Sequence, residues 1–119
     1  MDKIKFIYLY RDGSNYKSWG EVVFDNYEKI TLEEIEKRLT EAFLPDKLFI
    51  ASQISIPEKF SFLNGKFTKH DHCYHEFDGL EKCAESSTDS LRRSITDFLE
   101  DVELASKQGW EAFDVLDHS

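Results

Sequence analysis

The densest group of possible metal ligands in the chain lies between residues 70 and 78. Three of the four histidines, His70, His72 and His75, fall there, with Cys73 between them. Imidazole, thiolate and carboxylate groups bind metals and transfer protons. In an extended strand His70 and His72 share one face, whereas Cys73 and His75 share the other. Because neither pair has further ligands at a familiar spacing, we expect no bound metal.

A second set of chemically capable side chains follows the first predicted strand. It combines cations, an amide and aromatic rings around a small-residue turn: Arg11, Asn15, Tyr16, Lys17 and Trp19. Arginine and lysine bind anions, and aromatic rings stack on flat ligands. The set suits a nucleotide or another planar anion, although it lacks the phosphate-binding and dinucleotide-binding glycine patterns. An ordinary polar hairpin loop accounts for the same residues.

A third possible anion site is the pair Arg92 and Arg93, just before the second predicted helix. The positive end of the helix dipole favours anions, and adjacent arginines strengthen that preference. A capped helix with two solvated arginines explains the pair equally well. The chain has neither a G-x-S-x-G turn nor an H-E-x-x-H helix, so no catalytic residue is assigned.

The charge balance restricts the partners of the chain. The formal net charge is −9, from 24 acidic and 15 basic residues. This disfavours non-specific nucleic-acid binding and an anionic membrane surface, which both need a basic face. No segment has the length and apolarity of a membrane helix, and the N-terminus has no signal-peptide core. We therefore expect a cytoplasmic protein whose two cysteines remain thiols.

Alternating apolar residues predict strands over residues 4–10, 19–25, 48–54 and 73–77. The first strand is apolar on both faces, which indicates a central position in a sheet. The first two strands form an antiparallel pair. Asn64-Gly65 predicts a further hairpin between residues 60 and 68.

Two helices are predicted from capping signals and apolar spacing. Thr31 followed by Glu34 predicts the start of a helix that ends before Leu44-Pro45. Residues 81–93 read as a surface loop. Ser94 then begins a second helix that stops at Gly109, after which Trp110 and Phe113 fold back onto the core.

These elements predict one domain over residues 1–119. The order of strands and helices favours an α+β fold, with an antiparallel sheet of about four to five strands and two amphipathic helices packed on one face. A parallel doubly wound sheet would need more alternation between strands and helices.

The sequence favours a small, non-catalytic binding protein for a small anionic or nucleotide-like ligand, such as a signalling nucleotide that it sequesters. Its site combines the loop over residues 11–19 with the strand over residues 72–76. The expected ligand-binding residues are Arg11, Asn15, Tyr16, Lys17, Trp19, His72, Tyr74 and Arg92. No cofactor is expected.

Two other functions fit the sequence. One is a protein inhibitor or adaptor that docks a basic partner on an acidic helical face formed by Asp97, Glu100, Asp101 and Glu103. The other is a metal-dependent enzyme built on His70, His72 and His75. An exposed aromatic edge is also compatible with a homodimer.

Overall fold

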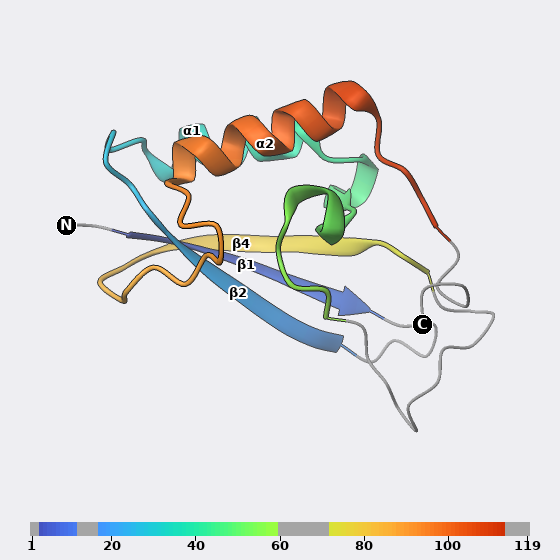
Figure 1. The fold of residues 1–119 in the computed structure, drawn as a ribbon, viewed down its shortest axis with the longest axis horizontal. Helices are drawn as coiled ribbons and strands as arrows, with labels where there is room; N and C mark the ends of the chain where they lie inside the picture. The colour runs from blue at the N-terminus through green and yellow to red at the C-terminus, as the bar shows by residue number, and fades with distance from the viewer. Residues whose placement is uncertain (1–2, 12–16, 60–71, 114–119) are drawn as a thin grey trace.

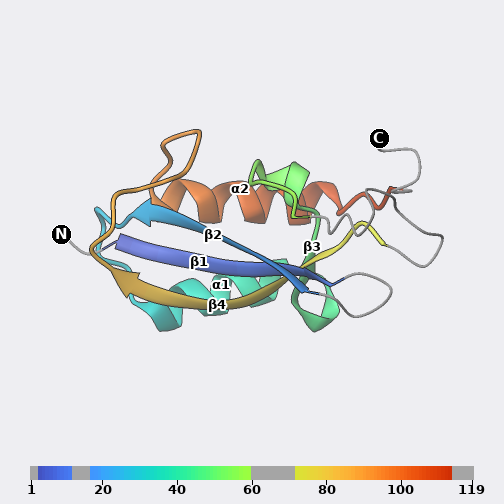
Figure 2. The same cartoon turned by 90° about the horizontal axis from the view of Figure 1, so that it is seen from below.

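The computed structural model describes residues 3–11, 17–59 and 72–113. These residues form one antiparallel sheet of four strands in the order β2–β1–β4–β3. The strands are β1 (Lys3–Arg11), β2 (Lys17–Asp25), β3 (Leu48–Phe49) and β4 (His75–Cys83). The helices are α1 (Leu32–Ala42) and α2 (Ile95–Gln108), with short 3-10 turns η1 (Pro45–Lys47) and η2 (Ala51–Ile54). Both helices cover the same face of the sheet (Figures 1 and 2), which confirms the predicted α+β fold.

The core lies between the helices and the central strand β1. Ile4, Phe6 and Tyr8 alternate along β1 and are completely buried. The ring of Phe6 stacks on Phe77 of β4 at 5.2 Å between centroids, and it meets Phe98 of α2 edge-on at 5.2 Å. Large aromatic side chains bury much apolar area and prefer these offset and edge-on contacts. These even-numbered residues of β1 therefore point toward the helices and form the core.

The helices begin and end where their capping residues predict. The hydroxyl of Thr31 accepts a hydrogen bond from the Glu34 N–H at 3.2 Å, and that of Ser94 accepts one from the Asp97 N–H at 3.2 Å. Each cap satisfies a backbone donor that the first turn leaves without a partner. Gly109 ends α2 with φ at +98°, a conformation that glycine adopts without a steric penalty.

The predicted strand over residues 48–54 is wrong beyond Phe49. The backbone turns instead into η2, and Ser55 follows in the left-handed region with φ at +56°. Ala51 and Ile54 are both buried, and their spacing of three matches the period of a 3-10 turn. The apolar pattern thus satisfies a tight turn as well as it would a strand.

The last strand begins at His75, two residues later than predicted, and is longer than the sequence indicates. β4 runs to Cys83, so the first residues of the predicted loop 81–93 are in fact paired with β1, with Glu81 opposite Lys5 and Cys83 opposite Lys3. Asp78 is an extra residue at a bulge, because Ile7 pairs with Gly79 while Tyr8 pairs with Phe77. The predicted hairpin around residues 64–65 lies outside the described residues.

The chain beyond α2 returns to the core, as predicted. The Trp110 indole N–H donates to the Ala42 carbonyl at 3.0 Å, and the Trp110 ring lies 6.0 Å from that of Phe43. Phe113 packs against a small cluster that contains Tyr10 and Cys73. Cys73 and Cys83 are both free thiols, in agreement with the sequence. Within the described part of the chain, neither helix has the length and apolarity needed to cross a membrane.

Candidate ligand site at one end of the sheet

Strand register brings the predicted site segments to the same end of the sheet. Arg11 pairs directly with Lys17, and Leu9 pairs with Trp19 on one side and Glu76 on the other. Directly opposed residues project from the same face, which here is the face away from the helices. Leu9, between Trp19 and Glu76 in the ladder, is 1% exposed.

We call Arg11, Lys17, Trp19, His72 and Glu76 the sheet-end site. The term covers the residues of the two predicted segments that the structure brings to this end of the sheet.

An ion pair links the two segments. One Arg11 guanidinium nitrogen lies 3.6 Å from a Glu76 carboxylate oxygen. This distance exceeds the roughly 2.7–2.9 Å of a charge-assisted hydrogen bond. Both side chains are about one-third exposed, at 38% for Arg11 and 32% for Glu76. Solvent and small solutes can therefore reach this pair.

His72 holds the segments together through both ring nitrogens. Its Nε2 lies 2.8 Å from the carbonyl oxygen of Arg11, so Nε2 must be the donor. Its Nδ1 accepts a hydrogen bond from the Tyr74 N–H at 3.0 Å. The Tyr10 hydroxyl also donates to the His72 carbonyl at 2.7 Å. These contacts define a neutral imidazole with its proton on Nε2 and give His72 a positioning role.

Trp19 borders an open cavity at the edge of the sheet. Its side chain is 53% exposed. The cavity has a volume of about 510 Å³ and is lined by Ile7, Trp19, Gly20, Glu21 and Lys59. Gly20 is required here, because a Cβ atom would lie 2.7 Å from Cζ of Tyr8 and 2.9 Å from the Lys59 side chain. The site thus offers an aromatic face beside a lysine.

Of the other predicted ligand residues, Tyr74 is half-buried against the cluster that contains Tyr10 and Cys73. Asn15 and Tyr16 fall outside the described residues. Arg92 is exposed and lies two residues before Ser94, which bridges to Asp25 at the far end of β2. Asp25 and Lys17 are at opposite ends of this strand, about 26 Å apart at 3.3 Å per residue. The structure therefore separates Arg92 from the sheet-end site.

The histidine-rich segment between residues 70 and 78 has a structural explanation in its described part. His75 is completely buried, and its Nε2 accepts a hydrogen bond from the Lys59 N–H at 2.8 Å. Burial lowers the pKa of His75 to about 4. Among the described residues, no three His, Cys, Asp or Glu side chains gather as metal ligands. His70 lies outside these residues, so the metal-enzyme hypothesis stays a prediction.

Sequence reasoning missed the role of Arg93. Its guanidinium forms two hydrogen bonds to the Asp89 carboxylate, at 2.9 and 2.8 Å, and a third to the Ile54 carbonyl at 2.9 Å. It also lies 5.1 Å from the centre of the Phe98 ring. Burial alone would raise the pKa of Asp89, but the hydrogen bonds from Arg93 outweigh it and lower that pKa. The i,i+4 spacing of the two residues was the available signal.

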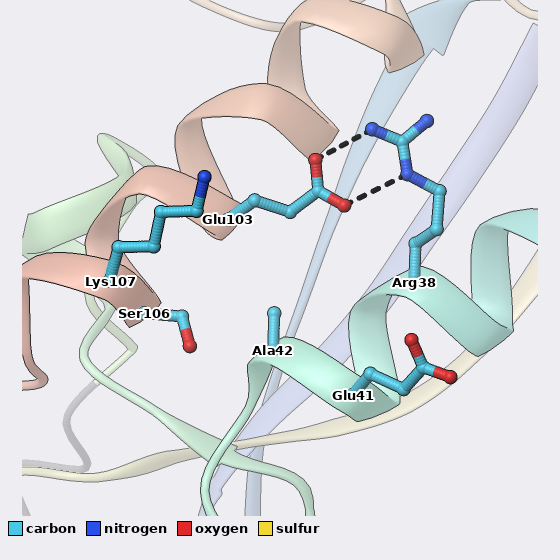
Figure 3. A pocket seen from close by; sticks show the side chains of 6 residues that line it. All are labelled: Arg38, Glu41, Ala42, Glu103, Ser106 and Lys107. Carbon is cyan, nitrogen blue, oxygen red and sulfur yellow. Dashed lines mark hydrogen bonds and ion pairs between the residues drawn. The ribbon is translucent and has the colours of Figure 1, made fainter.

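A polar cavity separates the C-terminal parts of α1 and α2 (Figure 3). Its volume is about 340 Å³, and Arg38 and Glu103 meet at its wall in a two-pronged ion pair of 3.0 and 2.7 Å. The hydrogen bonds from Arg38 lower the pKa of Glu103. Together α1 and α2 carry eight acidic and three basic residues, so more than half of the net negative charge lies on the helical layer.

The hydrogen bonds of Arg93 and His75 thus stabilise the fold. Of the predicted binding residues, Arg11, Lys17, Trp19 and His72 lie at the sheet-end site. Comparisons of the chain with protein-family models, curated proteins and solved structures find no match.

Proposed function

We propose that the protein is a non-catalytic cytoplasmic binding protein, and that its sheet-end site takes a small anionic ligand with a flat ring, such as a nucleotide. One observation carries the proposal: Arg11 and Lys17 stand directly opposite each other, two pairs along the ladder from the exposed Trp19 and on the same face. Like charges opposed across a ladder are destabilising. An anionic group between these two cations removes the repulsion, while Trp19 offers a face for a ring.

Glu76 and His72 have different parts in this proposal. Glu76 offsets the charge of Arg11 at 3.6 Å when no ligand is bound, and a phosphate competes with it because it can accept two parallel guanidinium hydrogen bonds. His72 holds the backbone of Arg11 in place through its Nε2–H. With both ring nitrogens engaged, His72 supports a role in binding better than one in proton transfer.

Thermal unfolding in the presence of nucleotides and inorganic phosphate tests this function. A ligand that binds only the folded state raises the Tm by several degrees when it is well above its Kd. Arg11→Ala and Trp19→Ala should each remove most of that rise. Arg92→Ala is the matched control, because it deletes an exposed arginine at the other end of the sheet. A panel without any effect on Tm, or an equal loss in all three variants, would overturn the proposal.

A basic protein partner is the second candidate function. The acidic residues of α1 and α2 lie on adjacent helices joined by Arg38 and Glu103, and Asp97, Glu100 and Asp101 are exposed. A negative surface of this kind attracts a basic partner in a salt-dependent manner. Charge reversal at Asp97 and Glu100 should weaken capture of such a partner, whereas Asp101 also pairs with Arg93 at 3.1 Å and is left unchanged. Capture that is insensitive to both salt and these substitutions would rule this function out.

A further inference from the structure

Among the described residues, contacts to the outer edge of β2 are confined to one half of the strand. Near its C-terminal end, Thr88 accepts a hydrogen bond from the Val23 N–H at 2.9 Å and donates its own N–H to the Val23 carbonyl at 3.0 Å. Ser94 then bridges to Asp25. Figure 2 shows the segment after β4 running beside this half of β2. The backbone groups at this half of the edge therefore already accept contacts from outside the β1–β2 ladder.

The other half of the edge presents the same backbone groups. Val23 directs its N–H and C=O away from β1, and the ladder between β1 and β2 is regular from Asp25 to Lys17. Because backbone direction alternates with a period of two, Glu21, Trp19 and Lys17 also direct these groups outward. Within the described ranges, no hydrogen bond from outside the sheet reaches the backbone of these three residues.

This open edge is suited to pairing with itself. We propose that residues 17–21 of β2 pair antiparallel with the same residues of a second copy of the chain, around a two-fold axis at Trp19. This register places Lys17 of each copy opposite Glu21 of the other, so that two opposite-charge pairs flank the centre. It also places the two Trp19 side chains, each 53% exposed, against one another. Because pairing covers Trp19 and engages Lys17, the dimer and a ligand at the sheet-end site compete for these two side chains. The two four-stranded sheets then form one continuous sheet.

The opposite edge of the sheet is less suited to such pairing. Beyond the short pairing with β3, the edge of β4 carries the bulge at Asp78. Bulges twist an edge away from regular pairing and are a common protection against association. The regular, charge-complementary half of β2 has no such protection among the described residues.

The mass of the full-length chain in solution tests the proposal, for example by analytical ultracentrifugation at concentrations up to about 1 mM. The wild-type chain should show twice its mass of 14.0 kDa. Lys17→Glu and Glu21→Lys should each be monomeric, because each places like charges opposite one another in both pairs. An equimolar mixture of the two variants should restore the dimer, because every pair then joins a glutamate with a lysine.

A proline variant distinguishes the loss of edge pairing from the loss of folding. The Glu21 N–H points away from β1, so Glu21→Pro removes an outward donor and no bond of the ladder. This variant should remain folded by circular dichroism and lose the dimer. A wild-type chain that stays at 14.0 kDa would overturn the proposal and leave the edge to an extended segment of a different protein. A dimer that survives both charge reversals, or a mixture that does not restore it, would also overturn it.

Discussion

Arg11 and Lys17 lie directly opposite each other across the β1–β2 ladder and project from the face of the sheet away from the helices. Glu76, 3.6 Å from Arg11, offsets part of this concentration of positive charge. The protein as a whole is strongly acidic, with a net charge of −9. A local pair of cations on such a background is the feature from which the proposed binding site follows.

Removing the charge of Lys17 should stabilise the protein and weaken the binding of anions. At protein concentrations low enough to keep the chain monomeric, Lys17→Gln ends the repulsion with Arg11, which should raise the free energy of unfolding by about 0.2–1 kcal/mol at low salt. The gain should disappear at about 1 M salt, where charges are screened. Urea unfolding at both salt concentrations provides the measurement. Lys37→Gln, at an exposed position on α1, is the control and should show no such salt-dependent gain.

Acid should destabilise the fold through His75. Its pKa falls from 6.5 to about 4 on burial, so the folded protein binds fewer protons than the unfolded chain between these values. The stability due to neutral His75 is complete above pH 6.5 and is lost as the pH falls toward 4, by about 3 kcal/mol in total.

His75→Gln isolates this effect, because an amide can still accept the hydrogen bond from Lys59 but does not titrate. Unfolding free energies measured from pH 7 to pH 4 should decline more steeply for the wild type than for the variant. Parallel curves would show that His75 does not contribute.

Arg93 and Arg92 should differ sharply although they are neighbours. Arg93→Met leaves the buried Asp89 carboxylate without its partner, and loss of one member of such a pair typically costs about 3–5 kcal/mol. Arg92→Met changes an exposed side chain and should stay within about 0.5 kcal/mol of the wild type. Denaturant unfolding of both variants is the measurement. Equal losses would contradict the structural role of Arg93.

The two described strand glycines should respond differently to a methyl group. In Gly20→Ala the new Cβ meets the buried ring of Tyr8, whose hydroxyl is held by the Pro57 carbonyl at 2.6 Å. Such overpacking typically costs about 1–3 kcal/mol. Gly79→Ala meets no atom within 4 Å and should change stability by less than about 0.5 kcal/mol. Thermal unfolding of the pair checks this difference, and a similar Tm would show that Gly20 is not sterically required.

The elements that the sequence predicts correctly are those specified by local signals. β1 alternates with apolar residues on both sides, and α1 and α2 each begin at a serine or threonine that caps the third residue after it. These patterns depend only on neighbours along the chain. The α+β fold class and the central position of β1 follow from them.

The missed features depend on contacts between distant segments. The polar end of β4 forms a strand because Lys3 and Lys5 of β1 pair with it, although its own sequence resembles a loop. Similarly, Arg92 and Arg93 are adjacent arginines, and contacts made in the fold, among them those of Arg93 with the Asp89 carboxylate and the Ile54 carbonyl, distinguish them.

Within the candidate site, the sequence indicated that the two segments belong together. The role of His72 depends on the carbonyl of Arg11, 61 residues away, and could not be read from spacing. The separation of Arg92 from the site likewise follows from the bridge between Ser94 and Asp25, which is a feature of the folded sheet.

A nuclear magnetic resonance titration of the ¹⁵N-labelled chain with nucleotide tests the central claim most directly, because it locates a ligand without any substitution. Binding at the sheet-end site should shift the backbone signals of Arg11 and Lys17 and the indole signal of Trp19. The signals of Arg92 and of the indole of Trp110 should remain in place. Shifts confined to the region of Arg92 and the start of α2, or no shifts with any nucleotide, would contradict the proposed site.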